Sequence, residues 1–334
     1  MAINTKFGGK VDEFWNSEAQ FVRMNMVDAD NEKSNDDDLV KKMYNVKTSK
    51  RFGEKTIGMS SFSSFQYTKE GDKAPEDTLQ EVNPKLIEHS PFMKAYVVTA
   101  ELKEDSQQDM IAAGSKNFVH TYKRTRAEFG SAALCCEGTI FDFGGHTGFD
   151  RTTSDGKALF AKDHTGLSGV AAQSNVFTNA FGDDDVMLDR LANIGFNFKN
   201  TSGHTMGYVF DTLIVPGNCF RLIRLAKKII NSDQQVGNDF NDVNVNKGMW
   251  KLIVNPYWQA TAGTEPYIIM SSKANQELNG SLFYDRVPLT IKQDVDVYTH
   301  NLINSGRCRF SAGFGDWRHV IMGGATAGTE LTTL

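Results

Sequence analysis

One stretch of the chain, SDGKALFAKDHTGLSGVAAQSN at residues 154–175, contains the residue types found in several catalytic sites. Asp155, Asp163, His164 and Ser168 offer carboxylates, an imidazole and a hydroxyl, which are the components of a hydrolytic triad. A triad needs a third group that orients the imidazole within hydrogen-bond reach of the nucleophile. Adjacent side chains on an extended chain point to opposite faces, so Asp163 is poorly placed to orient His164. The surrounding Gly, Ser, Thr and Asn residues favour a surface loop over a catalytic one.

Other signatures of catalysis or metal binding are weak or absent. The sequence contains no P-loop, strand-linked GxGxxG, HExxH or GxSxG motif, and FGGHTGF at 143–149 is interpreted as a flexible turn. The acidic segment 28–38, DADNEKSNDDD, lacks the glycine and glutamate of a calcium loop and is expected to be a solvated loop. The seven histidines are scattered, and the four cysteines match no zinc spacing. We therefore expect no catalytic, metal or cofactor-binding residues, and we interpret Cys135 and Cys136 as small buried hydrophobes.

The composition is that of a folded protein with a sizeable core. Of the 334 residues, 40% are hydrophobic and 23% charged, with a formal net charge of −5. A general nucleic-acid binder would have a basic surplus instead. No run approaches the roughly 20 apolar residues of a membrane span, and the N-terminus does not resemble a signal peptide. We expect synthesis in a reducing cytosol.

The first 140 residues show three patterns. Residues 1–55 are polar, with Phe14 and Trp15 among the few apolar anchors. SSFSSFQYT (60–68) and KAYVVTAEL (94–102) are predicted strands of a long hairpin whose charged connection, KEGDKAPEDTLQEVNP, protrudes into water. A helix is predicted over about 106–136, beginning at a capping box formed by Ser106 and Asp109. Its apolar face follows helical spacing and consists of Ile111, Phe118, Tyr122, Phe129 and Ala133.

The second half mixes short helices and strands. Helices are predicted over 183–195 and from Pro216 to about Ser232, and a strand over 208–215. Further strands are predicted in MWKLIVNPYW, PYIIM, VPLTIKQDVDVYT and the closing RCRFSAGFGDWRHVIMGG. The interspersed elements indicate an α+β fold.

The order of three segments resembles the major capsid proteins of tailed bacteriophages, in particular the Mu-like major head subunits. The first is DGKxLF…H followed by a loop ending in Asn. The second is a strand–helix of the form LxVPxxLxxxAxxI. The third is N…N…G followed by a strand and an xPY turn. The corresponding residues are Asp155, Gly156, Lys157, Leu159, Phe160, His164 and Asn175; Leu213, Val215, Pro216, Phe220, Ala226 and Ile229; and Asn244, Asn246, Gly248, Pro256 and Tyr257. The chain departs from the pattern at Gly217-Asn218-Cys219, which is more polar than usual.

This resemblance implies the Hong Kong 97 capsid fold, which is α+β. It implies an N-terminal arm (1–52), an E-loop with flanking strands (53–101), a P-domain spine helix (102–139), an A-domain (140–285) and a return to the P-domain sheet with a C-terminal tail (286–334). It implies a structural major capsid protein, not an enzyme, that assembles as hexamers and pentamers into an icosahedral head around double-stranded DNA, without sequence-specific binding. The virion would be its location, after assembly in the cytoplasm of the bacterial host.

The candidate interface residues follow from this reading. Phe14 and Trp15 in the arm, and Phe62, Phe65 and Tyr67 in the E-loop, are expected to be buried only on assembly. Lys69 and Lys73 lie near the E-loop tip, where some family members form a lysine–asparagine cross-link, but no partner can be placed. A separate scaffolding protein and a portal are implied as partners, with no membrane; whether a decoration protein binds stays open. Two alternatives remain: an encapsulin-like nanocompartment shell, and a hydrolase using Asp163, His164 and Ser168.

Overall fold

The computed structural model describes residues 13–59, 62, 64–76, 81–105, 107–165, 170–183, 185–234, 243–261 and 263–331. The chain divides into two compact units, each built from three separate segments. Unit 1 comprises Met1–Glu54, Ile87–Gly130 and Phe283–Ala312, and unit 2 comprises Lys55–Leu86, Ser131–Leu282 and Gly313–Leu334. Within the described ranges, every helix is too short or too polar to cross a lipid bilayer.

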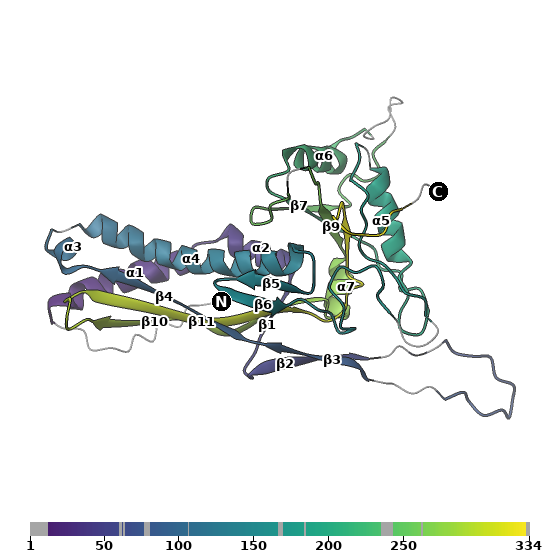
Figure 1. Cartoon of the computed structure of the whole chain (residues 1–334), viewed down its shortest axis with the longest axis horizontal. Coiled ribbons are helices and arrows are strands. Elements are labelled where there is room, and N and C mark those ends of the chain that lie inside the picture. The colour runs from purple at the N-terminus through teal and green to yellow at the C-terminus, as the bar shows by residue number, and fades with distance from the viewer. Residues whose placement is uncertain are drawn as a thin grey trace. The chain divides into compact units, whose positions relative to one another are not determined.

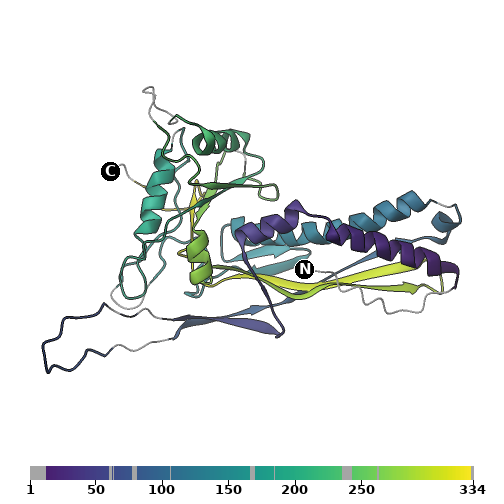
Figure 2. The ribbon, with the colours of Figure 1, turned by 180° about the vertical axis from the view of Figure 1, so that it is seen from behind.

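Unit 1 is a four-stranded sheet with helices on one face (Figure 1; Figure 2). The strand order is β1-β10-β11-β4, and β11 runs antiparallel to β4. The helices pack over a core that includes Trp15, Val22 and Met26 from the N-terminal segment and Ile111 and Val119 from the longest helix. The elements are η1 (Glu13–Trp15), α1 (Asn16–Asn31), α2 (Asn35–Met43), β1 (Asn45–Thr48), β4 (Ser90–Val98), α3 (Ala100–Glu104), α4 (Gln108–Cys135), β10 (Ser281–Val295) and β11 (Leu302–Phe314).

Helix α4 confirms the long amphipathic helix predicted from the sequence. Its apolar stripe faces the core, since Ile111, Phe118 and Phe129 are each less than a tenth exposed. The two glycines that weaken the helix are explained by close packing: a Cβ at Gly114 would collide with the Tyr96 ring, and one at Gly130 would press on Tyr44. The structure begins α4 at Gln108, and Ser106 of the predicted capping box lies outside the described residues.

The interpretation of residues 28–38 as a solvated loop is wrong. Asp28 to Asn31 form the last turn of α1, and Asp36 to Asp38 form the first turn of α2. The Ser34 hydroxyl caps α2 by accepting a hydrogen bond from the backbone N–H of Asp36, at 3.2 Å. Carboxylates are favourable in the first turn of a helix because they face the positive end of its dipole. The acidic run therefore starts a helix.

The predicted hairpin is displaced along the chain. Residues 62 and 64–68 carry no strand, and residues 60, 61 and 63 lie outside the described ranges. The paired strands are β2 (Gly53–Met59) and β3 (Glu81–Glu88), which form a two-stranded sheet of their own. KAYVV does lie in a strand, β4, but this strand pairs with β11. The predicted strand ends early because the Thr99 side chain caps α3.

Unit 2 contains a second four-stranded sheet, in the order β12-β9-β7-β8. Strands β7 and β8 are parallel, and helix α6 lies between them in the chain, as a parallel pair requires. The predicted strands and helices of this half are confirmed in type. The elements are β5 (Ile140–Phe143), β6 (His146–Asp150), α5 (Val186–Phe196), β7 (Thr212–Pro216), α6 (Phe220–Asn231), β8 (Lys251–Asn255), β9 (Tyr267–Met270), α7 (Ser272–Glu277) and β12 (Val320–Gly323).

Three details of unit 2 differ from the sequence predictions. Pro216 ends β7 and does not begin a helix, because it pairs in register with Asn255. FGGHTGF is a β-hairpin: Gly144 and Gly145 both have positive φ, at 60° and 82°, which suits a two-residue turn between antiparallel strands. Cys135 is buried as expected, but Cys136 is exposed, since α4 ends at Cys135.

Candidate functional site

The segment that looked catalytic forms a buried hydrogen-bond network in unit 2. Nδ1 of His164 donates to Oδ2 of Asp155 at 2.6 Å, and Nε2 of His164 lies 3.2 Å from Oδ1 of Asn175. The imidazole also stacks on Trp317, with ring centroids 4.2 Å apart and planes 6° from parallel. His164 and Asn175 are fully buried. The ring therefore has neighbours on both nitrogens and on one face.

Asn175 and Asp155 extend this network to the backbone. The Asn175 amide donates to the carbonyls of Leu159 and Val320, at 2.8 and 3.2 Å. Oδ1 of Asp155 accepts from Thr153 Oγ1 and from the backbone N–H of Lys157. Burial acts to raise the pKa of Asp155, but the hydrogen bonds from His164 and Thr153 outweigh it and leave the pKa below its ordinary value. Asp155 is thus held as a carboxylate.

The other two residues of the hypothetical triad do not join the network. Asp163 is exposed and forms an ion pair with Lys157. The argument that Asp163 is poorly placed to orient His164 is confirmed, because the orienting carboxylate belongs to Asp155. Ser168 lies outside the described residues. An imidazole with no exposed surface and two occupied nitrogens cannot take a proton from a bound substrate. The network holds the two ends of its loop together, through the backbone pairing of His164 with Gln173.

A second serine–histidine pair was not anticipated from the sequence. Nε2 of His319 lies 2.6 Å from Oγ of Ser281, and Nδ1 lies 2.7 Å from the backbone carbonyl oxygen of Asp316. The carbonyl can only accept, so Nδ1 carries the hydrogen and Nε2 accepts from the serine hydroxyl. Burial lowers the pKa of His319 to about 4, which keeps this arrangement neutral. Both side chains are fully buried, so no substrate can reach the hydroxyl.

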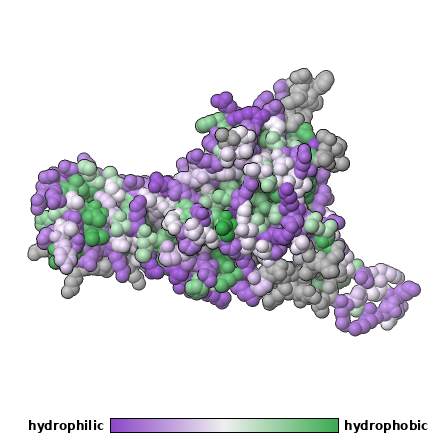
Figure 3. Space-filling model, in the orientation of Figure 1, coloured by the Kyte–Doolittle hydropathy of each residue, from purple (hydrophilic) through white to green (hydrophobic). Residues whose placement is uncertain are grey.

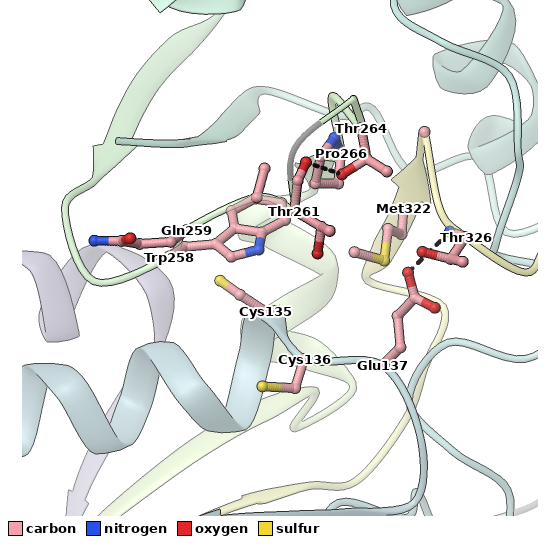
Figure 4. Close-up of a pocket in the computed structure, with 12 residues that line it drawn as sticks. Cys135, Cys136, Glu137, Trp258, Gln259, Thr261, Thr264, Pro266, Met322 and Thr326 are labelled. Carbon is pink, nitrogen blue, oxygen red and sulfur yellow. Dashed lines mark hydrogen bonds between the residues drawn. The ribbon is translucent and has the colours of Figure 1, made fainter. Parts of the chain in front are cut away.

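One cavity in unit 2 is lined by sulfur-containing and polar side chains (Figure 4). Its volume is about 370 Å³, with Cys135 and Cys136 at one end and Glu137, Met322 and Thr326 at the other. The surrounding protein desolvates both sulfur atoms and raises the pKa of both thiols, although Cys136 as a whole residue is exposed, so neither is an activated nucleophile. Glu137 accepts a hydrogen bond from the Thr326 backbone. Within the described ranges, no three His, Cys, Asp or Glu side chains gather in a metal-binding arrangement.

The two arm residues singled out from the sequence have different environments within unit 1. Trp15 is only 1% exposed, and its indole N–H donates to the His300 carbonyl at 3.1 Å. The expectation that Trp15 is buried only on assembly is therefore wrong: it is already part of the core of its own chain. Phe14 is 49% exposed, packs edge-on against Trp15 and lies 3.6 Å from the Lys103 ammonium. Phe14 keeps apolar surface that a neighbour could cover.

The three aromatic residues expected in the E-loop are exposed. Phe62, Phe65 and Tyr67 have exposed fractions of 58%, 108% and 92% in the segment between β2 and β3. Lys69 is also exposed, and Lys73 forms a surface ion pair with Glu76 at 2.8 Å. Three large aromatic side chains in water within six residues are unusual for a surface that stays uncovered. Their role as interface residues stays a prediction.

The open face of the unit 1 sheet is a further candidate surface that the sequence did not indicate. Phe92 and Tyr96 of β4 pack on Phe129 and Phe118 of α4, so the alternate residues of β4 point away from the helices. Two of these, Met93 and Val97, are 72% and 45% exposed. On the neighbouring β11, Arg307 pairs with Met93 and Ile303 with Val97. We name Met93, Val97, Ile303, Arg307 and the exposed Lys292 of β10 the open sheet face. Figure 3 shows apolar patches among hydrophilic surface on unit 1.

Comparison with known proteins gives a clear likeness in structure and none in sequence. No protein-family model and no curated protein matches the chain. Among solved structures, the capsid of the native GTA particle is 12% identical with a TM-score of 0.56, over 88% of this chain and 91% of that one. The capsid of Myoviridae phage XM1 is 14% identical with a TM-score of 0.53, over 85% and 90%. A chain of Mycobacterium phage Patience is 11% identical with a TM-score of 0.53, over 96% and 90%.

The matches extend over nearly the whole of both chains, so they include both units and not a shared fragment. The prediction of an α+β capsid architecture is confirmed. The chain has the fold of phage capsid subunits, the Hong Kong 97 fold.

Proposed function

We propose that this chain is the major capsid protein of a tailed bacteriophage, a structural subunit without catalytic activity. The observation that carries the proposal is the extent of the structural likeness: about nine tenths of the GTA and XM1 capsid chains are matched. Copies would assemble as hexamers and pentamers into an icosahedral head. The burial of both histidine networks supports a non-enzymatic role, because neither is open to a substrate.

Two exposed surfaces support assembly through repeated contacts. We infer that the segment 62–76 of one copy covers the open sheet face of a neighbour. The segment offers Phe65 and Tyr67 with the acidic Glu70 and Asp72 close by in sequence, while the open sheet face offers Met93 and Val97 beside basic Arg307. Apolar surface meets apolar surface and charges of opposite sign meet at the rim, as in stable interfaces. Phe62, Lys69 and Lys73 belong to the same proposed contact.

The domain plan of the family can be laid over the structure as part of the proposal. The arm (1–52) would contain α1 and α2, the E-loop (53–101) the β2–β3 sheet, and the spine helix (102–139) α4. The A-domain (140–285) would contain most of unit 2, and 286–334 would return to the sheet and end in the tail. The Mu-like subfamily is the finer assignment, and it rests on the motif order. The network of Asp155, His164 and Asn175 gives that motif a structural purpose.

The proposed contents and partners follow from the shell function. Double-stranded DNA would be enclosed without sequence-specific contacts, and the net charge of −5 suits a container that does not hold its genome tightly. A separate scaffolding protein and a portal would take part in assembly in the host cytoplasm, and the virion would be the final location. An encapsulin-like shell around enzyme cargo is the alternative with the same fold.

Electron microscopy of the purified full chain tests the proposal. We expect closed polyhedral particles, or a mixture of hexamers and pentamers. A protein that stays monomeric at all concentrations, salt conditions and with crowding agents would overturn it. Particles made in infected cells should contain nuclease-protected double-stranded DNA, whereas protein cargo in place of DNA would favour the nanocompartment. A ladder of covalent multimers in denaturing gels, lost on replacing Lys69 and Lys73 with Arg, would establish cross-linking.

A further inference from the structure

The most unusual local pattern in unit 2 is the tetrapeptide Val243–Asn244–Val245–Asn246, in which the amides are buried and the valines exposed. Asn244 and Asn246 are 5% and 6% exposed, whereas Val243 and Val245 are 80% and 79% exposed. Burying a polar side chain while an adjacent apolar one stays in water costs free energy, unless hydrogen bonds to the buried group compensate. Two questions follow: what holds the amides inside, and which surface covers the exposed valine side chains.

The amides are buried because they join two helices. Asn244 Nδ2 donates to the carbonyls of Ile229 and Ser232, at 2.6 and 2.9 Å, and so completes the C-terminal end of α6. Asn246 Nδ2 donates to Asp185 Oδ2 at the start of α5, at 3.0 Å. This anchoring fixes the outward direction of the valines, but it does not dictate that the exposed positions be apolar. Two β-branched apolar residues there indicate a surface that becomes covered.

The charges on the two anchored helices point to what covers it. The solvent face of α6 carries Arg224, Lys227 and Lys228, which form no ion pair within the described part of the chain. The exposed face of α5 carries Asp189, for which the described ranges also hold no ion pair, together with Val186 and Phe196, each 45% exposed. Burial and the nearby Asp185 carboxylate raise the pKa of Asp189, as expected where negative charge lacks a cation.

We propose that the basic face of α6 in one copy docks on the exposed face of α5 in the next copy, with Val243 and Val245 buried between them. The occupant is a second copy because the same unit carries both complementary surfaces. Within the described ranges, α6 offers three cations that form no ion pair, and α5 offers a carboxylate that forms none, beside apolar side chains. Such a head-to-tail contact uses two different patches, so it repeats from copy to copy, and it closes into a ring when the rotation between copies divides a full turn. This inference rests on the proposed function, because it requires copies of the chain to meet around an axis.

Charge reversal tests the pairing on the full chain. Lys227→Glu with Lys228→Glu should lower the yield of closed particles or rings at least tenfold at about 0.1 M salt, since like charges then face each other. Adding Asp189→Lys to the same chain should restore the yield to within about threefold of the unaltered protein. The matched control is Lys41→Glu with Lys42→Glu, two exposed lysines in the last turn of α2 in unit 1, which changes the net charge equally and should leave assembly unchanged.

The readouts separate this inference from the proposed function. Each variant is first checked for an unchanged unfolding midpoint as an isolated subunit, so that lost assembly is not lost folding. If the unaltered protein never assembles, the proposed shell function is wrong. If the unaltered protein assembles and the Lys227/Lys228 variant assembles equally well, or if Asp189→Lys does not restore its yield, the α5–α6 pairing is wrong while the shell function stands.

Discussion

His164 donates to Asp155 across nine residues of sequence, not to its neighbour Asp163, and this pairing closes the loop that begins the second half of the chain. The distance from Nδ1 to Oδ2 is 2.6 Å, and the imidazole is sealed between Asn175 and the Trp317 ring. The sequence offers two carboxylates, Asp155 and Asp163, as partners for the His164 imidazole, and the buried one is the partner in the structure. Asp155 is nearly enclosed, whereas Asp163 lies in water and contacts Lys157.

Replacing His164 with Ala should destabilise the isolated subunit by about 3 kcal/mol or more, because it leaves the buried Asp155 carboxylate without its partner. Asp155→Asn should have a smaller effect in the same direction, since the amide still accepts one hydrogen bond. Chemical denaturation followed by tryptophan fluorescence measures both, as Trp317 stacks on the lost ring. Asp163→Asn is the control and should change the free energy of unfolding by less than about 0.5 kcal/mol. Equal losses in all three variants would refute the assignment.

The buried His319 should make the subunit less stable at mildly acidic pH. Its pKa is about 4 in the folded chain, below the ordinary value of 6.5, because burial disfavours the charged ring. The unfolded chain binds a proton below pH 6.5 that the folded chain does not bind until about pH 4. Stability is therefore highest above pH 6.5 and falls by about 3 kcal/mol between these two values, at 1.36 kcal/mol per unit.

Unfolding midpoints in denaturant, measured from pH 7.5 to pH 4, give this slope. In His319→Gln the slope should be shallower, although part remains, since burial also lowers the pKa of His89 and that residue contributes in the same direction. A variant whose stability depends on pH as steeply as the unaltered protein would show that His319 is not the group that titrates.

Lys123 should be essential to the stability of unit 1, because it holds the end of α1 against α4. Its ammonium is buried and donates to three carbonyls at the end of α1, those of Ala29, Asp30 and Glu32, each at 2.9 Å. Lys123→Met keeps the aliphatic volume but removes the ammonium that donates to all three carbonyls, so we expect the free energy of unfolding to fall by about 3 kcal/mol. Faster hydrogen exchange in α1 and α2 should accompany it. Arg124→Met on the exposed side of α4 removes only an i,i+4 ion pair and should cost about 0.5 kcal/mol or less.

How far the sequence predicts this molecule depends on the range of the interactions involved. The apolar periodicity of α4 predicted its face and length, since each turn repeats the same local rule. The acidic composition of residues 28–38 favours a loop, whereas the Ser34 cap and the helix dipole favour α2, so composition alone predicts this segment wrongly. The partner of β4 could not be predicted, because β11 lies some 200 residues away and edge pairing leaves no local signal.

The candidate sites show the same limit. That Asp163 is poorly placed to orient His164 follows from strand geometry alone. The true partner, Asp155, required the loop to fold back, and the Ser281–His319 pair joins residues 38 apart. The sequence predicts that Trp15 is buried only when another copy binds, but its indole N–H donates to the carbonyl of His300, near the other end of the same chain. An aromatic side chain is expected to be buried in some contact. Only the fold shows whether that contact lies within its own chain or with another copy.

Replacing the loop aromatics should separate folding from assembly. Phe65 and Tyr67 touch water over nearly their whole surface, so Phe65→Ser with Tyr67→Ser should leave the unfolding midpoint of the subunit unchanged. If these rings are anchors between copies, the same change removes the best-packed part of the contact and should raise the concentration needed for assembly at least tenfold. Sedimentation or light scattering against protein concentration measures it. Phe52→Ser, a 67% exposed ring outside the loop, controls for general loss of surface apolarity and should assemble normally. Assembly that is equally impaired in both would mean that the loop holds no special anchor.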